Sequence, residues 1–282
     1  MRRLAGAQEL LDGPLDDPVT LQGNLRDLAR VNRRLGGTDL SRRAVERLLD
    51  HRHGAQTLLD VGTGAADIPV ALVAAAAAGG RDLRVTAVDS RPEILDAARA
   101  VNRRLAATPG VELVLGDGRS LPWPDRSFDV VHASLLLHHL EPRDAIAFLA
   151  EASRLARRGV VMNDLVRGRH HWIGARVLLT LATRNRYTRH DGPMSVQRAY
   201  TRVELRALLA AAGLRPLAEE VAFAGHRVAI AAVAIPPGAD EPAPGERPAA
   251  GEPPSPGEPP APGEPPTPGE PPSPGERPAA GR

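Results

Sequence analysis

Acidic residues recur where short apolar runs of the sequence end. Asp60 closes the run Leu-Leu-Asp, Asp89 closes Val-Thr-Ala-Val-Asp, and Asp117 follows Leu-Val-Leu-Gly. A carboxylate at the second position can accept two hydrogen bonds from a ribose diol, and one at the third can accept from an exocyclic amine. The glycines around Asp60 would let backbone approach such a ligand closely. These residues predict a site for a nucleoside-containing ligand.

Asp67, at the start of the next predicted helix, restricts the class of cofactor that could bind. A dinucleotide fingerprint places a third glycine where Asp67 stands, and a carboxylate at a helix start repels phosphate. The sequence therefore favours a cofactor without phosphate groups. It disfavours the first alternative, an oxidoreductase of the NAD type on a similar fold.

The elements that must position these residues alternate along the chain from Thr57. Strand-like runs are expected at 57–61, 83–88, 111–115, 128–133, 159–163, 217–223 and 227–235, and helices at 67–78, 91–105, 142–156 and 201–212. This alternation predicts an α/β fold, a Rossmann-like, doubly wound sheet of seven mostly parallel strands. The last two runs form a hairpin that makes the final strand antiparallel.

Two further regions flank this domain, which spans residues 51–237. Residues 1–50 are expected to form an N-terminal helical cap, with helices over 21–35 and from Asp39, as its cap residue, to Leu49. Residues 238–282 repeat a Gly-Glu pair every six residues among many prolines, which predicts a disordered, Pro-rich tail. The tail is interpreted as a repeat-expanded segment with little bearing on activity; the alternative is a spacer or a ligand for a proline-recognising module.

Four segments in this order carry a family resemblance: LLDVGTGAAD, VTAVDSRPEIL, LVLGDGRSLPWPDRSFDVV and HASLLLHHL. Across roughly residues 50–235 the chain resembles the class I S-adenosylmethionine-dependent methyltransferases. The resemblance implies S-adenosyl-L-methionine as cofactor, with the methionine moiety near the glycine turn, the ribose near Asp89 and the adenine near Asp117. The implied cofactor residues are Asp60, Gly62, Thr63, Gly64, Asp89, Ser90, Asp117, Gly118 and Ser134. One departure is Ala66, where many members have a third glycine.

Other segments resemble particular methyltransferases within that group. The stretch LPWPDRSFDVV with LHHL looks like the quinone and small-metabolite subgroup, of types 11 and 25, and NDLVRGRHHW and RHDGPMSVQRAYTRVEL are similar to methyltransferases of bacterial natural-product pathways. This resemblance implies a small-molecule acceptor that is phenolic, quinone-like or polyketide-derived. The alternative is a catalytically silent cofactor-binding protein whose tail recruits partners.

The acceptor side needs a group that can remove a proton. His138 and His139 follow the fourth strand run, and either imidazole could be that base. Asp164, just after the fifth run, could bind an acceptor hydroxyl or hold a histidine tautomer. The competing interpretation is that these residues pack, cap a helix or orient backbone.

The insert over residues 167–200 is long enough to form a lid over an acceptor. Its apolar residues, with Trp172 among them, are expected to pack as an ordinary helix against the sheet, while His190, Asp191 and Arg198 are predicted to contact the acceptor. No metal site is expected, because His51 with His53 and His170 with His171 are too short and isolated as motifs.

Composition excludes several other classes of protein. The chain has no cysteine, so disulfides, thiolate metal sites and a catalytic cysteine are excluded, and a cytoplasmic location is the expectation. The longest apolar stretch, 68–78, is too short for a transmembrane segment. Aromatic residues make up 2% of the chain, so no nucleic-acid partner is expected.

Overall fold

The structure is a computed structural model that describes residues 1–49 and 54–236. Residues Met1–Pro237 form one compact unit. The predicted tail, with its hexapeptide repeat, and the histidines His51 and His53 lie outside the described residues. Within the part that is described, no helix is long and apolar enough to cross a membrane.

Seven strands form one sheet in the order β3-β2-β1-β4-β5-β7-β6. The strands are β1 (Gln56–Val61), β2 (Leu83–Asp89), β3 (Val111–Leu115), β4 (Phe128–Ser134), β5 (Ala156–Leu165), β6 (Leu214–Val221) and β7 (Arg227–Ala234). Strands β1 to β5 pair in parallel, and β7 is antiparallel to both β5 and β6. The predicted doubly wound sheet and its terminal hairpin are confirmed.

Eight α-helices and four short 3-10 turns connect the strands in the described residues. The helices are α1 (Pro18–Arg34), α2 (Gly37–Glu46), α3 (Asp67–Ala78), α4 (Pro92–Val101), α5 (Pro142–Leu155), α6 (Arg169–Ala182), α7 (Arg186–Arg198) and α8 (Arg202–Ala211). The turns are η1 (Leu10–Asp12), η2 (Leu105–Ala107), η3 (Leu137–His139) and η4 (Phe223–Gly225). Both predicted cap helices and all four predicted crossover helices are present.

Several boundaries differ from the sequence-based expectation, and two of them, in α2 and α4, change the role expected of a residue or the length of a helix. Asp39 does not cap α2, because the helix already begins at Gly37 after Gly36, whose φ of 82° is left-handed. Asp39 instead lies in the first turn and pairs with Arg42 at 2.7 Å. The helix expected at 91–105 ends at Val101, and a separate 3-10 turn follows at Leu105–Ala107.

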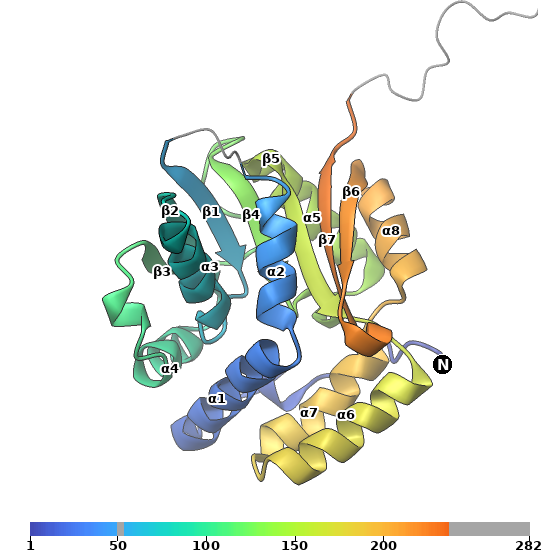
Figure 1. Ribbon diagram of the computed structural model, residues 1–282. Coiled ribbons are helices and arrows are strands. Elements are labelled where there is room, and N and C mark those ends of the chain that lie inside the picture. The colour runs from blue at the N-terminus through green and yellow to red at the C-terminus, as the bar shows by residue number, and fades with distance from the viewer. Residues whose placement is uncertain (50–53, 237–282) are drawn as a thin grey trace, which may run out of the picture. The chain divides into compact units, whose positions relative to one another are not determined.

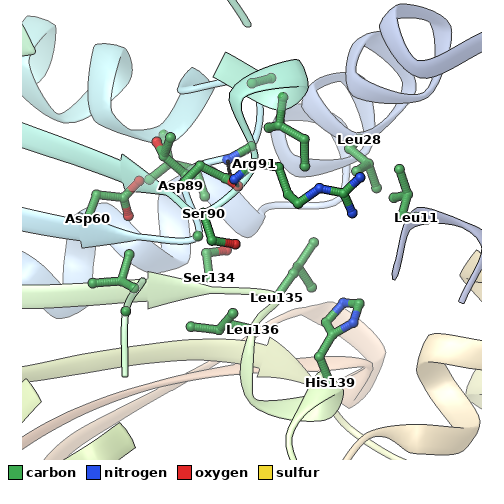
Figure 2. A pocket seen from close by; sticks show the side chains of 18 of the residues that line it. Leu11, Leu28, Asp60, Asp89, Ser90, Arg91, Ser134, Leu135, Leu136 and His139 are labelled. Atoms are coloured by element: carbon green, nitrogen blue, oxygen red, sulfur yellow. Dashed lines mark hydrogen bonds between the residues drawn. The ribbon is translucent and has the colours of Figure 1, made fainter. Parts of the chain in front are cut away.

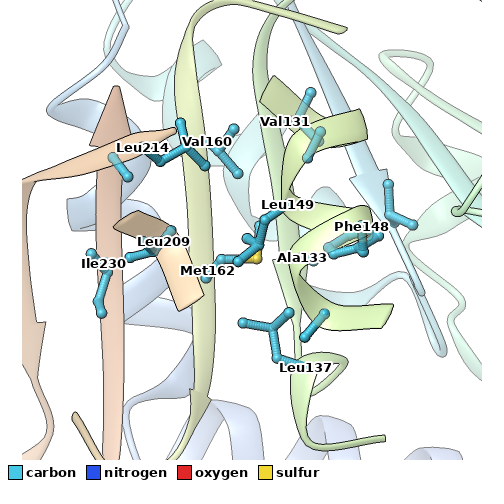
Figure 3. Packing of buried hydrophobic residues seen from close by; sticks show 14 of the residues in the cluster. Val131, Ala133, Leu137, Phe148, Leu149, Val160, Met162, Leu209, Leu214 and Ile230 are labelled. Atoms are coloured by element: carbon cyan, nitrogen blue, oxygen red, sulfur yellow. The ribbon is translucent and has the colours of Figure 1, made fainter. Parts of the chain in front are cut away.

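Helices cover both faces of the sheet (Figure 1). On one face α5 and α8 pack on β4, β5 and β7 through a cluster that includes Phe148, Leu149, Met162 and Ile230 (Figure 3). On the other face α2 and α3 pack on the sheet through a second cluster, which includes Leu40 and Leu72. These two apolar layers hold the parallel strands in register and so fix where their ends lie.

The insert between β5 and α8 forms a helical hairpin of α6 and α7. Together with α1 it lies beyond the carboxyl ends of the parallel strands (Figure 1). The expectation that its apolar residues pack against the sheet is wrong, because none of residues 169–182 is buried. Ile173, Val177 and Leu181 are 55%, 55% and 82% exposed. Helix α6 packs on α7 instead of the sheet.

The first residues of the chain run across α7 and are held by long-range hydrogen bonds. The Leu4 amide donates to the Gln197 carbonyl, and Arg3 donates to the carbonyls of Arg198 and Leu140. The guanidinium of Arg3 also lies over the Tyr200 ring. The N-terminal segment, residues 1–17, is therefore part of the domain and brings its carboxylates to the sheet edge.

Candidate active site

A cavity of about 610 Å³ opens at the carboxyl ends of the parallel strands. All nine predicted cofactor residues line it: Asp60, Gly62, Thr63, Gly64, Asp89, Ser90, Asp117, Gly118 and Ser134. The other wall is formed by α1 and the N-terminal segment, with Leu11, Asp12, Leu28 and Asn32 among its residues. In Figure 2, Asp89, Ser90 and Arg91 lie on one side of the cavity and His139 lies on the opposite side.

The turn after β1 has the backbone that close ligand approach requires. Gly62 and Gly64 have φ values of 71° and 55°, a left-handed region that strongly favours glycine. Ala66, where many relatives have glycine, also has a left-handed φ of 52°. After β3, a Cβ on Gly118 would come 2.4 Å from Cγ1 of Val61, the last residue of β1, so only glycine fits there.

One hydroxyl of this turn is unsatisfied. Thr63 is 7% exposed, and its Oγ1 has no hydrogen-bond partner among the described residues. An unpaired buried hydroxyl costs free energy, so its presence at a cavity wall indicates a ligand atom as its partner.

Asp89 is oriented at the end of β2 by two backbone amides. Gly64 N donates to Oδ2 at 3.1 Å and Arg91 N to Oδ1 at 3.2 Å. A carboxylate has about four acceptor positions, so both oxygens keep capacity for a ligand. Burial raises the pKa of Asp89 above its ordinary value, against the lowering effect of these amide bonds. The first residue of α4 is Pro92 and its cap is Arg91, so Ser90 is free of a capping role.

The third strand end differs from the other two. Both Asp117 oxygens accept hydrogen bonds from the Arg119 side chain, the shortest at 2.7 Å. Hydrogen bonds from Arg119 lower the pKa of Asp117, whose side chain is 49% exposed. A ligand amine would therefore share the Asp117 carboxylate with the Arg119 guanidinium or displace it.

The Asp60 carboxylate is held by a relay of hydrogen bonds between buried side chains, which the sequence did not predict. His132, its register partner on β4, donates from Nδ1 to Asp60 Oδ1 at 2.5 Å. The His132 Nε2 then accepts from the Ser41 hydroxyl at 2.8 Å, and Asn163 donates to that hydroxyl at 2.7 Å. These groups are buried, so α2 and β5 fix the orientation of a carboxylate on the cavity wall.

The relay begins at Arg227, the first residue of β7. Its side chain is 2% exposed and donates to Asn163 at 2.6 Å, Asn32 at 2.7 Å and Ser134 at 2.7 Å. Asn32 in turn donates to Asp67 at 3.2 Å. Burial lowers the pKa of Arg227 to about 10, partly offset by the charges of Asp164 and Asp67. A charged residue opening an otherwise apolar strand was the one sequence signal of this network.

The predicted catalytic residues come together at the other end of the cavity. His138 Nδ1 donates to Asp164 Oδ1 at 2.7 Å, and both side chains are buried. His139 lines the cavity, is 25% exposed, and donates from Nδ1 to Asp12 at 3.0 Å. His138 and Asp164 lie behind the wall, so His139 is the imidazole that a second ligand can reach.

A buried glutamate from the N-terminal segment faces both imidazoles. Glu9 Oε1 lies 3.9 Å from His138 Nε2, and Oε2 lies 3.8 Å from His139 Nε2. Burial raises the pKa of Glu9 to about 7, against the charges of His139 and Arg198. For Asp164, burial would raise the pKa, but His138 lowers it below its ordinary value. Sequence reasoning missed Glu9 and Asp12, because nothing in residues 9–12 indicates where that segment folds.

The three predicted acceptor contacts lie outside the cavity lining. Asp191 is 3% exposed and accepts from the amides of Leu10 at 2.8 Å and Leu11 at 3.1 Å. Arg198 donates to Asp12 at 2.9 Å and to the His139 carbonyl. His190 donates to Asp191 at 2.8 Å. In this structure these side chains anchor the N-terminal segment and η3, which themselves form the wall.

Comparisons with known proteins agree with the fold. The model of a methyltransferase domain family matches residues 58–159. An uncharacterised 37.1 kDa protein of a Streptomyces fradiae transposon is 35% identical over 143 residues, which cover 50% of this chain and 38% of that protein. The chain spans about two fifths of the length of the curated relatives it matches.

Solved structures of low sequence identity show the same fold. A methyltransferase from Aquifex aeolicus superposes with a TM-score of 0.52 at 22% identity, over 77% of this chain and 97% of that one. An O-methyltransferase of neocarzinostatin biosynthesis, in complex with S-adenosyl-L-homocysteine and 1,4-dihydroxy-2-naphthoic acid, has a TM-score of 0.56 at 20% identity, over 78% and 59%. Residues 58–159 therefore match a methyltransferase domain, and the described chain shares its fold with solved methyltransferases.

Proposed function

We propose that this protein transfers a methyl group from S-adenosylmethionine to a hydroxyl of a small aromatic or polyketide-derived molecule. The observation that carries the proposal is the convergence of three strand ends on one cavity, where Asp60, Asp89 and Gly118 meet. Structural neighbours that are O-methyltransferases support the acceptor class. They disfavour both the oxidoreductase and the silent-protein alternatives.

The residues present fit the cofactor. The Asp89 carboxylate can accept from the ribose diol, and the unpaired Thr63 hydroxyl supplies a hydrogen-bonding group beside the glycine turn. Gly62 and Gly64 give the turn its left-handed backbone, and Gly118 lets the chain after β3 pack closely on Val61 at the end of β1. Asp60, fixed by His132, offers a carboxylate to an amino group. When bound, S-adenosylmethionine supplies an electrophilic methyl group on a sulfonium.

The chain's own contribution is to align and deprotonate the acceptor. Methyl transfer is an in-line displacement, so a wall that fixes the acceptor oxygen supplies much of the rate. In the metal-free protein His139 Nε2 is the group positioned to accept the acceptor's proton, because Asp12 holds the Nδ1 proton. Asp164 accepts from both the amide and the Nδ1 of His138, whose ring packs against that of His139 at 4.3 Å between centroids.

His190, Asp191 and Arg198 keep an indirect role in this proposal. They anchor residues 9–12 and the His139 carbonyl, and so place the acceptor wall. The acceptor itself would be held by apolar residues of the wall, such as Leu11, Leu28 and Leu136, as small-molecule sites usually are.

Calorimetric titration of the full chain with S-adenosylmethionine, and separately with NAD, tests the proposal. We expect saturable binding of one equivalent of S-adenosylmethionine and no saturable binding of NAD. Incubation with the labelled cofactor and a panel of phenols, quinones and polyketides, followed by mass analysis, then identifies the acceptor. Saturable NAD binding without S-adenosylmethionine binding would refute the proposed function.

A further inference from the structure

A set of donors that proton transfer alone does not require lies beside the acceptor end of the cavity, where His139 lines the wall and Glu9 and His138 are buried behind it. Glu9, His138 and His139 each offer one ligand atom, and these three atoms all lie within 4.8 Å of one another. They come from the N-terminal segment and from η3, far apart in the sequence. We propose that Glu9, His138 and His139 bind a divalent transition-metal cation of the Zn²⁺ class at this end of the cavity.

The donor atoms match such a cation. Two imidazole nitrogens and one carboxylate oxygen are an established ligand set for catalytic zinc, which keeps a further position open. Ligands about 2.0–2.1 Å from a tetrahedral ion lie roughly 3.3–3.4 Å apart. The two Glu9 to imidazole distances, one from each carboxylate oxygen, are 3.9 and 3.8 Å, and the three ligand atoms lie within 4.8 Å of one another. The donors would therefore have to approach one another by about 0.5–1.5 Å to reach the spacing of a tetrahedral ion.

Both imidazoles are already oriented in the manner of metal ligands. The His138 ring donates its Nδ1 proton to Asp164, and the His139 ring donates its Nδ1 proton to Asp12. Metal-binding histidines almost always donate the other ring nitrogen to a carboxylate or carbonyl, which fixes the tautomer. Each Nε2 is thereby left as a lone pair, and both are directed toward the Glu9 carboxylate.

A second histidine pair in the chain shows that adjacency alone does not create this arrangement. His170 and His171 are also neighbours in sequence, and their rings lie 4.0 Å apart. Both ring nitrogens of His171 face backbone carbonyls, of Val166 and Ala224, so neither is directed to a carboxylate. This pair is a matched control for the proposed site.

The charges around the site also favour a cation. Glu9, Asp12 and Asp164 bring three carboxylates to the two imidazoles. A single guanidinium, that of Arg198, contacts two of them, Glu9 at 3.4 Å and Asp12 at 2.9 Å. Ser195 donates to Glu9 Oε1 at 3.0 Å, which leaves Oε2 facing His139. A divalent cation between the two imidazoles would be attracted by these carboxyl groups.

The role of the ion rests on the proposed methyl transfer, whereas the metal site itself does not. A cation held by His139 would lie at the acceptor end of the cavity, where it would bind an acceptor hydroxyl and lower its pKa, with the proton released to solvent. His139 would then act as a ligand, and ionisation of the acceptor would depend on the cation.

Metal binding can be measured without the cofactor or an acceptor. The untagged full chain is stripped with a chelator, then titrated with Zn²⁺ by calorimetry and with Co²⁺ by visible absorption. We expect one equivalent to bind, with the absorption bands of a low-coordinate Co²⁺ site. The substitutions E9Q, H138Q and H139Q should each abolish this binding. D12N and D164N should weaken it by about 10- to 100-fold, and H170Q should leave it unchanged.

X-ray absorption at the zinc edge of the unmodified protein provides a test that no folding defect can confound. Two imidazoles with oxygen donors in the zinc shell would agree with the proposal. No stoichiometric binding, binding unaffected by H139Q, or a shell without imidazole would overturn it. Because S-adenosylmethionine binding is measured separately, a failed metal titration leaves the methyltransferase proposal standing, and a failed cofactor titration leaves the metal site standing.

Discussion

The two ends of the cavity are built in different ways. At the cofactor end, Asp60, Asp89 and Ser134 lie at the ends of parallel strands, which topology brings to one edge of the sheet. At the acceptor end, His139 meets carboxylates from the N-terminal segment, and α7 holds that segment in place. The first end follows from local patterns repeated along the chain. The second depends on contacts between residues more than a hundred positions apart.

The hydrogen bonds that hold the side chains and backbone in place also differ between the two ends. The cofactor end is fixed by a relay of hydrogen bonds between buried side chains, from Arg227 through Asn163, Ser41 and His132 to Asp60. The acceptor end is fixed by ionised groups that hold backbone, such as Asp191 on the amides of Leu10 and Leu11. Substitutions at the two ends should therefore separate cofactor binding from the chemical step.

The largest difference between the effect on the rate of methyl transfer and the effect on cofactor affinity is expected for His139→Ala. Removal of the imidazole should lower the rate of methyl transfer by about 10²- to 10⁴-fold, the usual contribution of a positioned base. The dissociation constant for S-adenosylmethionine should not change, because the ring lies at the acceptor end. Single-turnover kinetics and calorimetry measure the two quantities, with His170→Ala as the control. A large loss of cofactor affinity together with an unchanged rate would reverse the assignment of the two ends.

The same contrast explains what the sequence could predict. Strand ends at Asp60, Asp89 and Asp117 could be located because apolar runs and glycine turns are local signals, and all nine predicted cofactor residues line the cavity. The positions of Glu9 and Asp12 in the site could not be predicted in this way, because their partners lie on η3 and α7. The packing of Trp172 and its apolar neighbours was misjudged for a related reason. Periodicity shows that a helix has an apolar face, and it does not show which element that helix packs on, which here is α7 and not the sheet.

Asp191→Asn should weaken the acceptor end through the backbone. The carboxylate accepts from two amides, and hydrogen bonds to a charged group each contribute roughly 1.5–3 kcal/mol. An amide side chain keeps one acceptor oxygen, so we expect the free energy of unfolding to fall by about 1.5–3 kcal/mol. Residues 1–17 should also become sensitive to limited proteolysis. Asp96→Asn, at an exposed carboxylate, is the control, and equal protection of both variants would contradict the anchoring role.

Asp89→Asn should weaken the cofactor end without changing the acceptor end. Loss of the carboxylate should reduce S-adenosylmethionine affinity by roughly 1–3 kcal/mol, or about 5- to 150-fold, because the diol loses a charged partner. The rate in the saturated complex should change little. An unchanged dissociation constant would count against Asp89 as the ribose ligand.

The same variant has a pH-dependent effect on the free protein. Because burial raises the pKa of Asp89, the ionised carboxylate destabilises the folded state relative to an isosteric amide at neutral pH. Asp89→Asn removes this charge but leaves one acceptor oxygen for the amides of Gly64 and Arg91, so the two effects oppose each other. The melting temperature of the cofactor-free variant, relative to that of the unmodified protein, should therefore rise as the pH rises from about 3.9, the value of an unfolded aspartate, through the raised pKa. A difference in melting temperature that does not change with pH would contradict this.

Thr63→Val is the smallest change and the most direct test of the cofactor wall. Its hydroxyl is buried and unpaired among the described residues, and valine has nearly the same shape. We expect the cofactor-free protein to gain about 1 kcal/mol, while S-adenosylmethionine affinity falls by about 0.5–1.5 kcal/mol. Thr57→Val provides the contrast, because the Thr57 hydroxyl donates to Asp129 at 3.1 Å and accepts from its amide. Thr57→Val should lower the free energy of unfolding and leave S-adenosylmethionine affinity unchanged. If both variants were more stable than the unmodified protein, the loss of a hydroxyl alone would explain the result at Thr63, and the missing ligand partner would not.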